Sequence, residues 1–475
     1  MPRSLHGIGG GGGSAAPARR GLVPALAAAL LAAAFAGAPA RAQSLNDALV
    51  MAYRSNPALL AERAQLRAQD EGVAQALSGW RPTVTATVDG GRQWYSSVPT
   101  AKAGSTPSST EYPRSGELVI TQNVYKGGKI EAQTRVADYN VLAERARLQL
   151  VEQTTMLNAA LAYINVVENQ ALVELNVNNE KVLAQQLEAT RDRFQVGEVT
   201  RTDVSQAEAQ LSAAHAGREA AENQLAIARA NYRTVIGVEP GKLADPGEPL
   251  GLPGTREESL SLAQHQNPNV TNAVYSERAA FANVDVQLSG LLPSLSIQAL
   301  LSKSEEQVSR IDDTSVAQVL AVLSLPIYTG GLADSQVRQA KEQVQAAKFQ
   351  VDTAERQAVQ DAASAWDSLA SARAQALSFQ DQIKANQVAL EGTQQEALAG
   401  LRTVLDVLNA QQALLTSQVS LVQSHHDAIQ AAYNLLNAVG RLTARDRQLP
   451  VEYYDPTAHY KETRGKWRGL GDPVE

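Results

Sequence analysis

The sequence has no cysteine among its 475 residues, which excludes disulfides, thiolate metal sites and a lipid-bearing N-terminal cysteine. Aromatic residues are also scarce, at 5% of the chain, and charged residues make up only 19%. A chain so poor in aromatics suits seams between helices better than a thick globular core. Its long polar stretches consist mainly of Ala, Gln, Leu, Val, Arg and Glu, a mixture that favours helix.

The N-terminal segment has the features of a secretory signal. A basic start precedes an apolar stretch at residues 22–35, and Ala40-Arg41-Ala42 offers small residues at the two positions that a signal peptidase reads. A membrane anchor is the alternative, but the stretch is short and is interrupted by proline and glycine. We therefore expect residues 1–42 to be a cleaved signal peptide.

The remainder of the chain is acidic. Removing residues 1–42 removes four arginines, which leaves 38 basic residues against 49 acidic ones and a net charge of about −11. Such a charge makes the chain a poor candidate for binding nucleic acid. After residue 42 no run of 18 uncharged apolar residues occurs, so no transmembrane helix is predicted there.

The sequence is internally duplicated. Early motifs recur at an offset of 211 residues and later ones at an offset of 203, held without a gap across more than a hundred residues. The first half therefore carries eight extra residues between positions 88 and 118. The recurring motifs are Asn56-Pro57 with Asn267-Pro268, Tyr125-x-Gly127-Gly128 with Tyr328-x-Gly330-Gly331, and Gly197-x-x-Thr200-x-x-Asp203 with Gly400-x-x-Thr403-x-x-Asp406.

Each half predicts the same order of elements: a helix, two strands, a very long helix, a turn and a returning helix. Period-two alternation predicts the strands, and glycine pairs allow the sharp change of path from strand to long helix. Both long helices lack proline over 68 residues, a length of roughly 100 Å. The strands are expected at about 82–92, 116–125, 293–302 and 316–328, with strand-connecting loops at 96–115 and 302–315 and long helices at 129–196 and 332–399.

These elements divide the chain into five parts. The lengths of the leading and returning helices of each half together nearly equal the length of the long helix. The two shorter helices can therefore line the long one end to end and form a rod of paired helices. The fold class is therefore mainly α with a small β contribution. The parts are the signal at 1–42, a first repeat at 43–237, a linker at 238–256, a second repeat at 257–445 and a C-terminal tail at 446–475, which either wraps the rod or stays flexible.

The four predicted strands have the length that a bilayer requires of a tilted strand. Strands in lipid must close into a barrel, because an open edge leaves backbone groups unpaired, and eight strands are the usual minimum. Four strands cannot close alone, so several copies of the chain must contribute. The sequence does not choose between two, three and four copies.

The duplicated plan resembles the TolC family of trimeric outer-membrane export channels. The turns at 196–204 and 399–407 are similar to the periplasmic tip motifs of that family, and the resemblance extends over residues 44–445. It implies a homotrimer in the cell outer membrane, with a twelve-stranded barrel in lipid and an α-helical tunnel extending into the periplasm. It also implies docking on an inner-membrane transporter through a periplasmic adaptor protein, with no cofactor.

The resemblance also implies a gate at the helical tip. By position Arg402 matches the gating arginine, Thr202 and Asp203 match its partners, and Asp406 matches an acidic ring. The chain departs from the family at Asn409, which replaces a second ring acid, and at Ala397, which replaces a gating tyrosine. The closing network and any cation site are accordingly expected to be weaker.

The same residues have structural explanations. Thr200-x-x-Asp203 and Thr403-x-x-Asp406 fit helix N-caps with an acid at the third position, a role compatible with a ring for Asp406. Gly197 and Gly400 are interpreted as turn residues rather than hinges.

Two further features are read as structural. His425-His426-Asp427 lacks a third ligand at a suitable spacing, so it is interpreted as a solvated helix face rather than a metal site. Tyr163 and Trp366 are expected to pack between helices.

No catalytic constellation is found, so we do not expect an enzyme. The function favoured is an exit duct for a tripartite efflux pump or a type I secretion system. The alternative is a periplasmic coiled-coil scaffold or adaptor without a pore. The exported cargo is not specified by the sequence.

Overall fold

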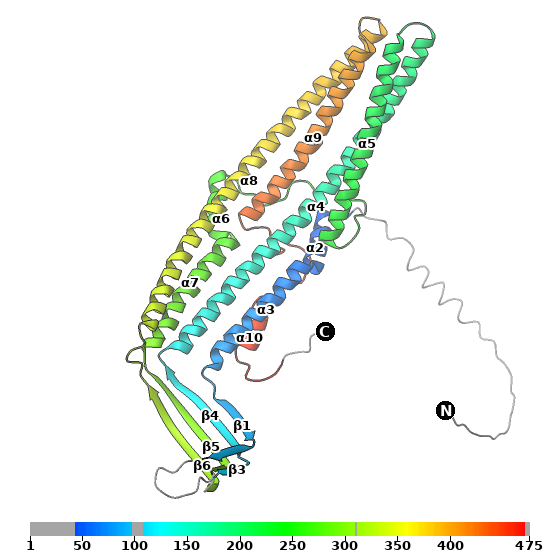
Figure 1. The fold of residues 1–475 in the computed structure, drawn as a ribbon. Coiled ribbons are helices and arrows are strands. Elements are labelled where there is room, and N and C mark those ends of the chain that lie inside the picture. The colour runs from blue at the N-terminus through cyan, green and yellow to red at the C-terminus, as the bar shows by residue number, and fades with distance from the viewer. Residues whose placement is uncertain (1–42, 97–107, 309–310, 471–475) are drawn as a thin grey trace, which may run out of the picture.

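The computed structural model describes residues 43–96, 108–308 and 311–470. The expected signal peptide lies outside these residues, as does most of the first strand-connecting loop. Figure 1 shows a long rod of helices with a small sheet at one end and two helical hairpin turns at the other. No helix in the described part of the chain is both long and apolar enough to cross a membrane.

The leading helix of each half is interrupted at its Asn-Pro pair, as Asn-Pro chemistry favours. Each asparagine is the C-cap of one helix and the N-cap of the next. Its amide also donates a hydrogen bond to the end of the returning helix, from Asn56 to the Val235 carbonyl at 3.2 Å and from Asn267 to the Ala438 carbonyl at 3.0 Å. The helices are α2 (Leu45–Ser55) and α3 (Pro57–Ser78), then α6 (Arg256–Gln266) and α7 (Pro268–Leu288).

The two long helices have equal lengths and begin 203 residues apart. They are α4 (Lys129–Gln195) and α8 (Leu332–Leu398), each of 67 residues. The returning helices are α5 (Arg201–Ile236) and α9 (Val404–Ala438). Helix α4 packs against α2, α3 and α5, and α8 packs against α6, α7 and α9, so three shorter helices of the same half line each long one.

The strands form one antiparallel sheet in the order β1-β4-β5-β6. An additional hairpin, β2 and β3, lies in the first half where the sequence carries its extra residues. The strands are β1 (Thr83–Gly90), β2 (Gln93–Ser96), β3 (Ser108–Glu111), β4 (Arg114–Lys126), β5 (Ser294–Val308) and β6 (Ile311–Ser324).

The loop expected at 302–315 was a wrong prediction, because β5 and β6 continue through most of it. Lys303 lies 2.9 Å from Glu305 along its own strand and 3.6 Å from Asp313 across the hairpin. Strand β6 also ends at residue 324 rather than 328. Pro326 lies just beyond this end, and proline has no N–H to donate to a strand partner.

The main core lies at mid-height of the rod. Tyr163 of α4 and Tyr232 of α5 are fully buried there, with ring centroids 6.4 Å apart. Trp366 is partly buried against a second cluster between α8 and α9, so the packing predicted for Tyr163 and Trp366 is confirmed. The helix-face interpretation holds for exposed His425 but is wrong for His426, which is 6% exposed. Adjacent residues on a helix point about 100° apart, and burial lowers the pKa of His426 to about 4.

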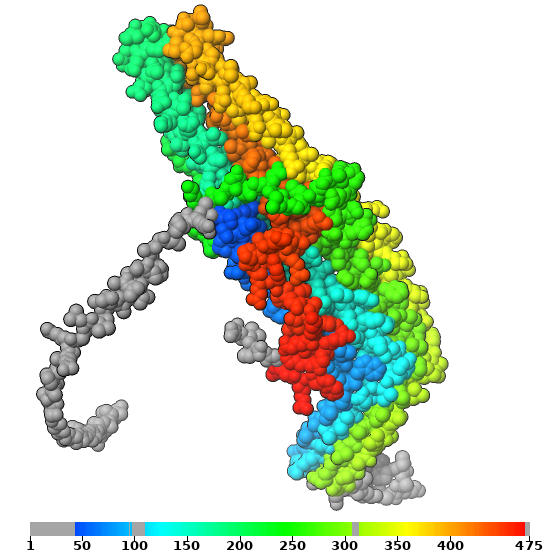
Figure 2. All heavy atoms as spheres, turned by 180° about the vertical axis from the view of Figure 1, so that it is seen from behind, coloured from blue at the N-terminus to red at the C-terminus, as the bar shows by residue number. Residues whose placement is uncertain are grey.

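The described part of the tail wraps the rod instead of leaving it. Its short helix α10 (Ala458–Thr463) packs on α3, and Figure 2 shows the segment lying along one face of the helices. Asp138 of α4 accepts hydrogen bonds from the Tyr460 hydroxyl at 2.7 Å and from Arg464 at 2.9 Å. The proline-containing tail is thus held by specific polar contacts.

Candidate functional site at the helical turns

Both hairpin turns end their long helix in the same way. Gly197 and Gly400 adopt φ values of +80° and +75°, the left-handed conformation that glycine tolerates best. The next N–H in each turn donates back to the long helix, from Glu198 to the Arg193 carbonyl and from Leu401 to the Glu396 carbonyl, both at 2.9 Å. This is the Schellman arrangement, which satisfies the last helical carbonyls. The interpretation of these glycines as turn residues fits this geometry.

A capping box begins each returning helix. The Thr200 backbone N–H donates to Asp203 at 2.8 Å, and the Asp203 N–H donates to the Thr200 hydroxyl oxygen at 3.3 Å. Thr403 and Asp406 repeat this pair at 2.9 and 3.2 Å. The capping roles predicted from Thr-x-x-Asp are confirmed. Each box satisfies donors that a helix N-terminus otherwise leaves free.

Arg402 forms an ion pair inside its own turn. Its Nε lies 2.8 Å from Oε2 of Glu396, which is on the last turn of α8. The hydrogen bond to Glu396 and its negative charge, followed by the charge of Asp406, raise the pKa of Arg402. Both partners are about half exposed, so the guanidinium remains reachable from outside the turn.

Asp406 remains charged at neutral pH. Hydrogen bonds from the Thr403 backbone and hydroxyl, and the nearby Arg402, lower the pKa of Asp406. Asn409 is exposed three residues further along α9, on the same side of the helix. Thr202 is also exposed at the start of α5.

The two turns lie at the same end of the molecule and are joined by an apolar contact. Leu183 and Leu187 of α4 form a buried cluster with Val404 and Leu408 of α9. This contact holds the α4–α5 hairpin against the α8–α9 hairpin. Within the described chain Arg402 is paired with Glu396 and Asp203 with Thr200. The structure therefore does not bring Arg402 to Thr202 or Asp203 of the same chain, and their gating roles stay a prediction.

Glycines also form the junctions between strands and long helices. Gly128 and Gly331 are the N-caps of α4 and α8, with φ values of 77° and 81°. Their neighbours Gly127 and Gly330 have φ values of 61° and 65°. Gly127 is the constrained member of this set, since a Cβ there would lie 2.8 Å from both the Leu292 Cβ and the Ser289 carbonyl oxygen.

Sequence reasoning missed the charge pairs of the turns. Arg193 and Glu198 pair at 3.1 Å in the first turn, while the second uses Glu396 and Arg402. Arg193 and Glu396 are equivalent under the 203-residue offset, so the charge at this position is reversed between the repeats. Glycine spacing could have shown these residues to be neighbours in a turn. In the described residues, no cluster of three His, Asp or Glu side chains could hold a metal ion.

A family model described as "Outer membrane efflux protein" matches residues 48–238 and 259–441, which together form most of the chain. The chain is 36% identical over 440 residues to the outer membrane efflux protein BepC of Brucella suis, covering 92% of this chain and 94% of that protein. It is 27% identical over 426 residues to the outer membrane protein TolC of Vibrio cholerae, covering 85% and 92%.

The fold is also similar to a solved channel structure. The CmeC outer membrane channel of Campylobacter jejuni superposes with a TM-score of 0.75 at 16% identity, covering 89% of each chain. At this identity the likeness shows the fold alone. The overall fold is thus shared with that structure.

Proposed function

The chain belongs to the outer membrane efflux protein family, and from that membership we propose that three copies of it form the exit duct of a tripartite efflux pump or a type I secretion system. The duct crosses the outer membrane through the sheets and extends through the periplasm as a helical tunnel. The observation that carries the proposal is the open sheet at one end of a rod whose two hairpin turns lie together at the other.

The sheet supports assembly from several copies. Its order leaves β1 and β6 as edge strands among the described residues, and each has a partner on one side only. Unpaired strand edges are costly in lipid, where water cannot satisfy the backbone groups. Large apolar side chains are exposed on the sheet, including Val88 at 84%, Val319 at 72% and Leu323 at 69%. Pairing of β1 with β6 of a neighbouring copy would satisfy the strand edges, and contact with lipid would cover the apolar side chains. Three copies give twelve strands.

The helices also present surface that one chain does not cover. Helix α8 packs on α6, α7 and α9, yet Phe349, Leu377 and Val388 along it are exposed by 67%, 65% and 71%. Isolated exposed apolar residues are ordinary on protein surfaces, so these three support the proposal only together with the open edges of the sheet. A neighbouring copy beside α8 would bury these residues and continue the wall of the tunnel.

The hairpin turns are proposed as the gate and as the end that meets the partner proteins. Arg402 would exchange its Glu396 partner for Thr202 and Asp203 of a neighbouring copy when the tip closes. The Asp406 residues of the three copies would form a ring of negative charge. Asn409 is uncharged, so it would not add a second ring. A periplasmic adaptor would dock on the tip and connect the duct to an inner-membrane transporter, which selects the cargo. No catalytic step is needed in this role.

Single-channel conductance in a planar lipid bilayer tests the duct and its gate. Wild-type protein should give small discrete steps, and Arg402→Ala should give larger or longer openings because a closing contact is lost. Arg193→Ala is the matched control, since it removes the ion pair with Glu198 from the other turn. Silence from inserted wild-type protein would reject the duct. Equal behaviour of Arg402→Ala and wild type would reject only the gating role.

A further inference from the structure

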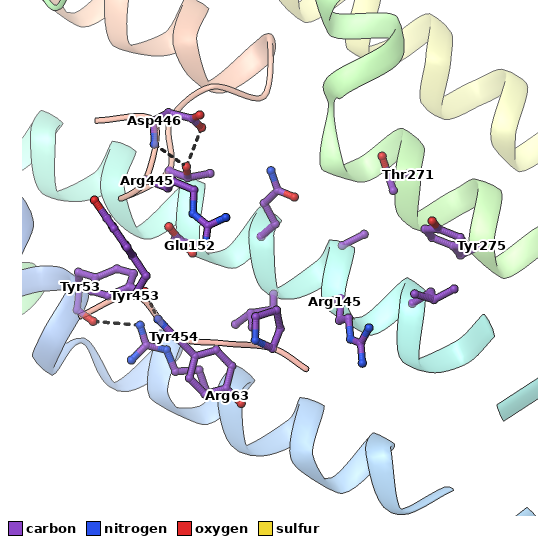
Figure 3. Close-up of a pocket in the computed structure, with 16 residues that line it drawn as sticks. Tyr53, Arg63, Arg145, Glu152, Thr271, Tyr275, Arg445, Asp446, Tyr453 and Tyr454 are labelled. Carbon is purple, nitrogen blue, oxygen red and sulfur yellow. Dashed lines mark hydrogen bonds between the residues drawn. The ribbon is translucent and has the colours of Figure 1, made fainter. Parts of the chain in front are cut away.

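A cavity of about 470 Å³ lies at mid-height of the rod, between the tail and helices α2, α3, α4 and α7. Three arginines line it from separate elements: Arg63 of α3, Arg145 of α4 and Arg445 of the segment after α9. We name it the arginine pocket. Figure 3 shows Arg63 with Tyr53, Tyr453 and Tyr454 at one end of this cavity, and Arg145 with Tyr275 toward the other.

Each of these arginines lies over a tyrosine ring. The Arg63 guanidinium carbon is 4.5 Å from the Tyr53 ring centroid and 5.2 Å from that of Tyr454. Arg145 lies 5.1 Å from the Tyr460 centroid, and Arg445 lies 5.7 Å from that of Tyr453. Stacking holds a guanidinium in position without using its edge N–H groups. One Nη of Arg63 donates to the Tyr53 carbonyl at 3.5 Å.

Within the described residues none of the three arginines has a carboxylate within ion-pair distance, although ten other arginines of the chain do. In addition, Nε and one Nη of Arg145 are buried without a hydrogen-bond partner. Leaving a buried charged donor unpaired is unfavourable. An acceptor supplied from outside the chain would remove this penalty.

The two carboxylates of the pocket are already engaged. Glu152 accepts a hydrogen bond from the Ala444 N–H at 2.8 Å, and Asp446 accepts one from the Thr443 hydroxyl at 2.6 Å. Burial raises the pKa of Glu152 despite the nearby Arg63 and Arg445. The remaining walls are tyrosine, leucine, alanine and proline, so the pocket combines net positive charge with apolar surface.

We propose that the arginine pocket binds a polycarboxylate, such as a small organic polyacid or a short acidic peptide segment. A guanidinium presents N–H donors in a planar fork that matches a carboxylate, and three of them favour a ligand with several such groups. The volume falls in the range of small-ligand sites. This site is separate from the proposed duct and gate, and it is absent from the second repeat, where Lys348 of α8 occupies the position equivalent to Arg145.

Isothermal titration calorimetry of the purified full-length protein in detergent tests the proposal with two probes, citrate and triglutamate. We expect saturable binding of at least one probe, one molecule per chain, weakening as salt is raised. Binding of citrate alone would identify a small polyacid and binding of triglutamate an acidic peptide. Arg145→Gln and Arg445→Gln should each weaken it about tenfold or more, whereas Lys348→Gln, the matched control on α8, should leave it unchanged.

Glu152→Gln provides a second variant whose effect does not depend on damage to the fold. It retains a hydrogen-bond acceptor for Ala444 and removes the opposing negative charge, so affinity should rise severalfold. The proposal is overturned if neither probe binds, if Lys348→Gln weakens binding as much as Arg145→Gln, or if Glu152→Gln weakens it in a protein with unchanged melting temperature. Conductance measured on the same preparation keeps failure of this site distinct from failure of the duct.

Discussion

Replacing Tyr163 by phenylalanine should destabilise the middle of the rod, because this hydroxyl joins three separate parts of the chain. It donates to the carbonyl of Gln43 or of Ala244, both at 2.7 Å, and accepts from the Ala244 N–H at 3.0 Å. Gln43 begins the described chain, and Ala244 belongs to the linker between the repeats. Tyr163 itself is fully buried in α4.

The size of the effect follows from the bonds that are lost. The hydroxyl donates one hydrogen bond and accepts another at the same time, and its partners are partly buried. The Ala244 N–H also donates to the Gln43 carbonyl at 3.2 Å, so these two groups keep a partner in the variant and chiefly the Ala244 carbonyl loses one. An unsatisfied buried group costs roughly 1–3 kcal/mol, so the loss in unfolding free energy should be about 1–3 kcal/mol. Burial raises the pKa of Tyr163 to about 12. A raised pKa means that this stabilisation is complete below pH 10 and is lost as the pH rises through 12.

Thermal unfolding followed by circular dichroism measures the effect, with Tyr232→Phe as the matched control. The Tyr232 hydroxyl is buried without a hydrogen bond of good geometry in the described chain, although the Gln43 side chain lies near it. Tyr163→Phe should melt several degrees below wild type, and Tyr232→Phe should melt close to it. Equal melting temperatures for the two variants would refute the assignment of Tyr163 as the residue that joins the linker to α4.

Other changes give distinct outcomes. Thr403→Ala should destabilise the start of α9 by ~0.5–2 kcal/mol because it removes the N-cap hydroxyl, as urea unfolding would show. Because the pKa of Asp406 is lowered, its contribution to the unfolding free energy is present above pH 3.8 and is lost as the pH falls through the folded-state pKa. Asp406→Asn should therefore flatten the acid side of a plot of stability against pH. Gly127→Ala should reduce the yield of folded protein more than Gly330→Ala, because both have positive φ but only the first would place a Cβ against other atoms; equal yields would contradict this.

The sequence was sufficient to predict the elements that depend on local chemistry. Offsets between repeats located the two long helices to within a residue or two, because proline-free stretches bounded by glycine have few alternatives. Thr-x-x-Asp spacing predicted both capping boxes because a box needs only four consecutive residues. The TolC-family resemblance is confirmed by the match to the outer membrane efflux protein family.

Features that depend on distant contacts were not predictable from local sequence. The hairpin at 302–315 contains charged residues typical of a loop, yet Lys303 has its carboxylate partners within the strands. Burial of His426 depends on which side of α9 meets its neighbours. The arginine pocket combines residues 63, 145 and 445, which no spacing relates, and the tail supplies two of its tyrosines.

Native mass spectrometry of the protein extracted from outer membranes in mild detergent tests the central claim most directly. The open edges of β1 and β6 and the exposed apolar residues of α8 predict that several chains associate, and the proposed duct sets their number at three. We therefore expect a complex of three chains that separates into single chains on boiling. A folded monomer, recovered from the soluble periplasmic fraction, would contradict the duct and favour a coiled-coil scaffold without a pore.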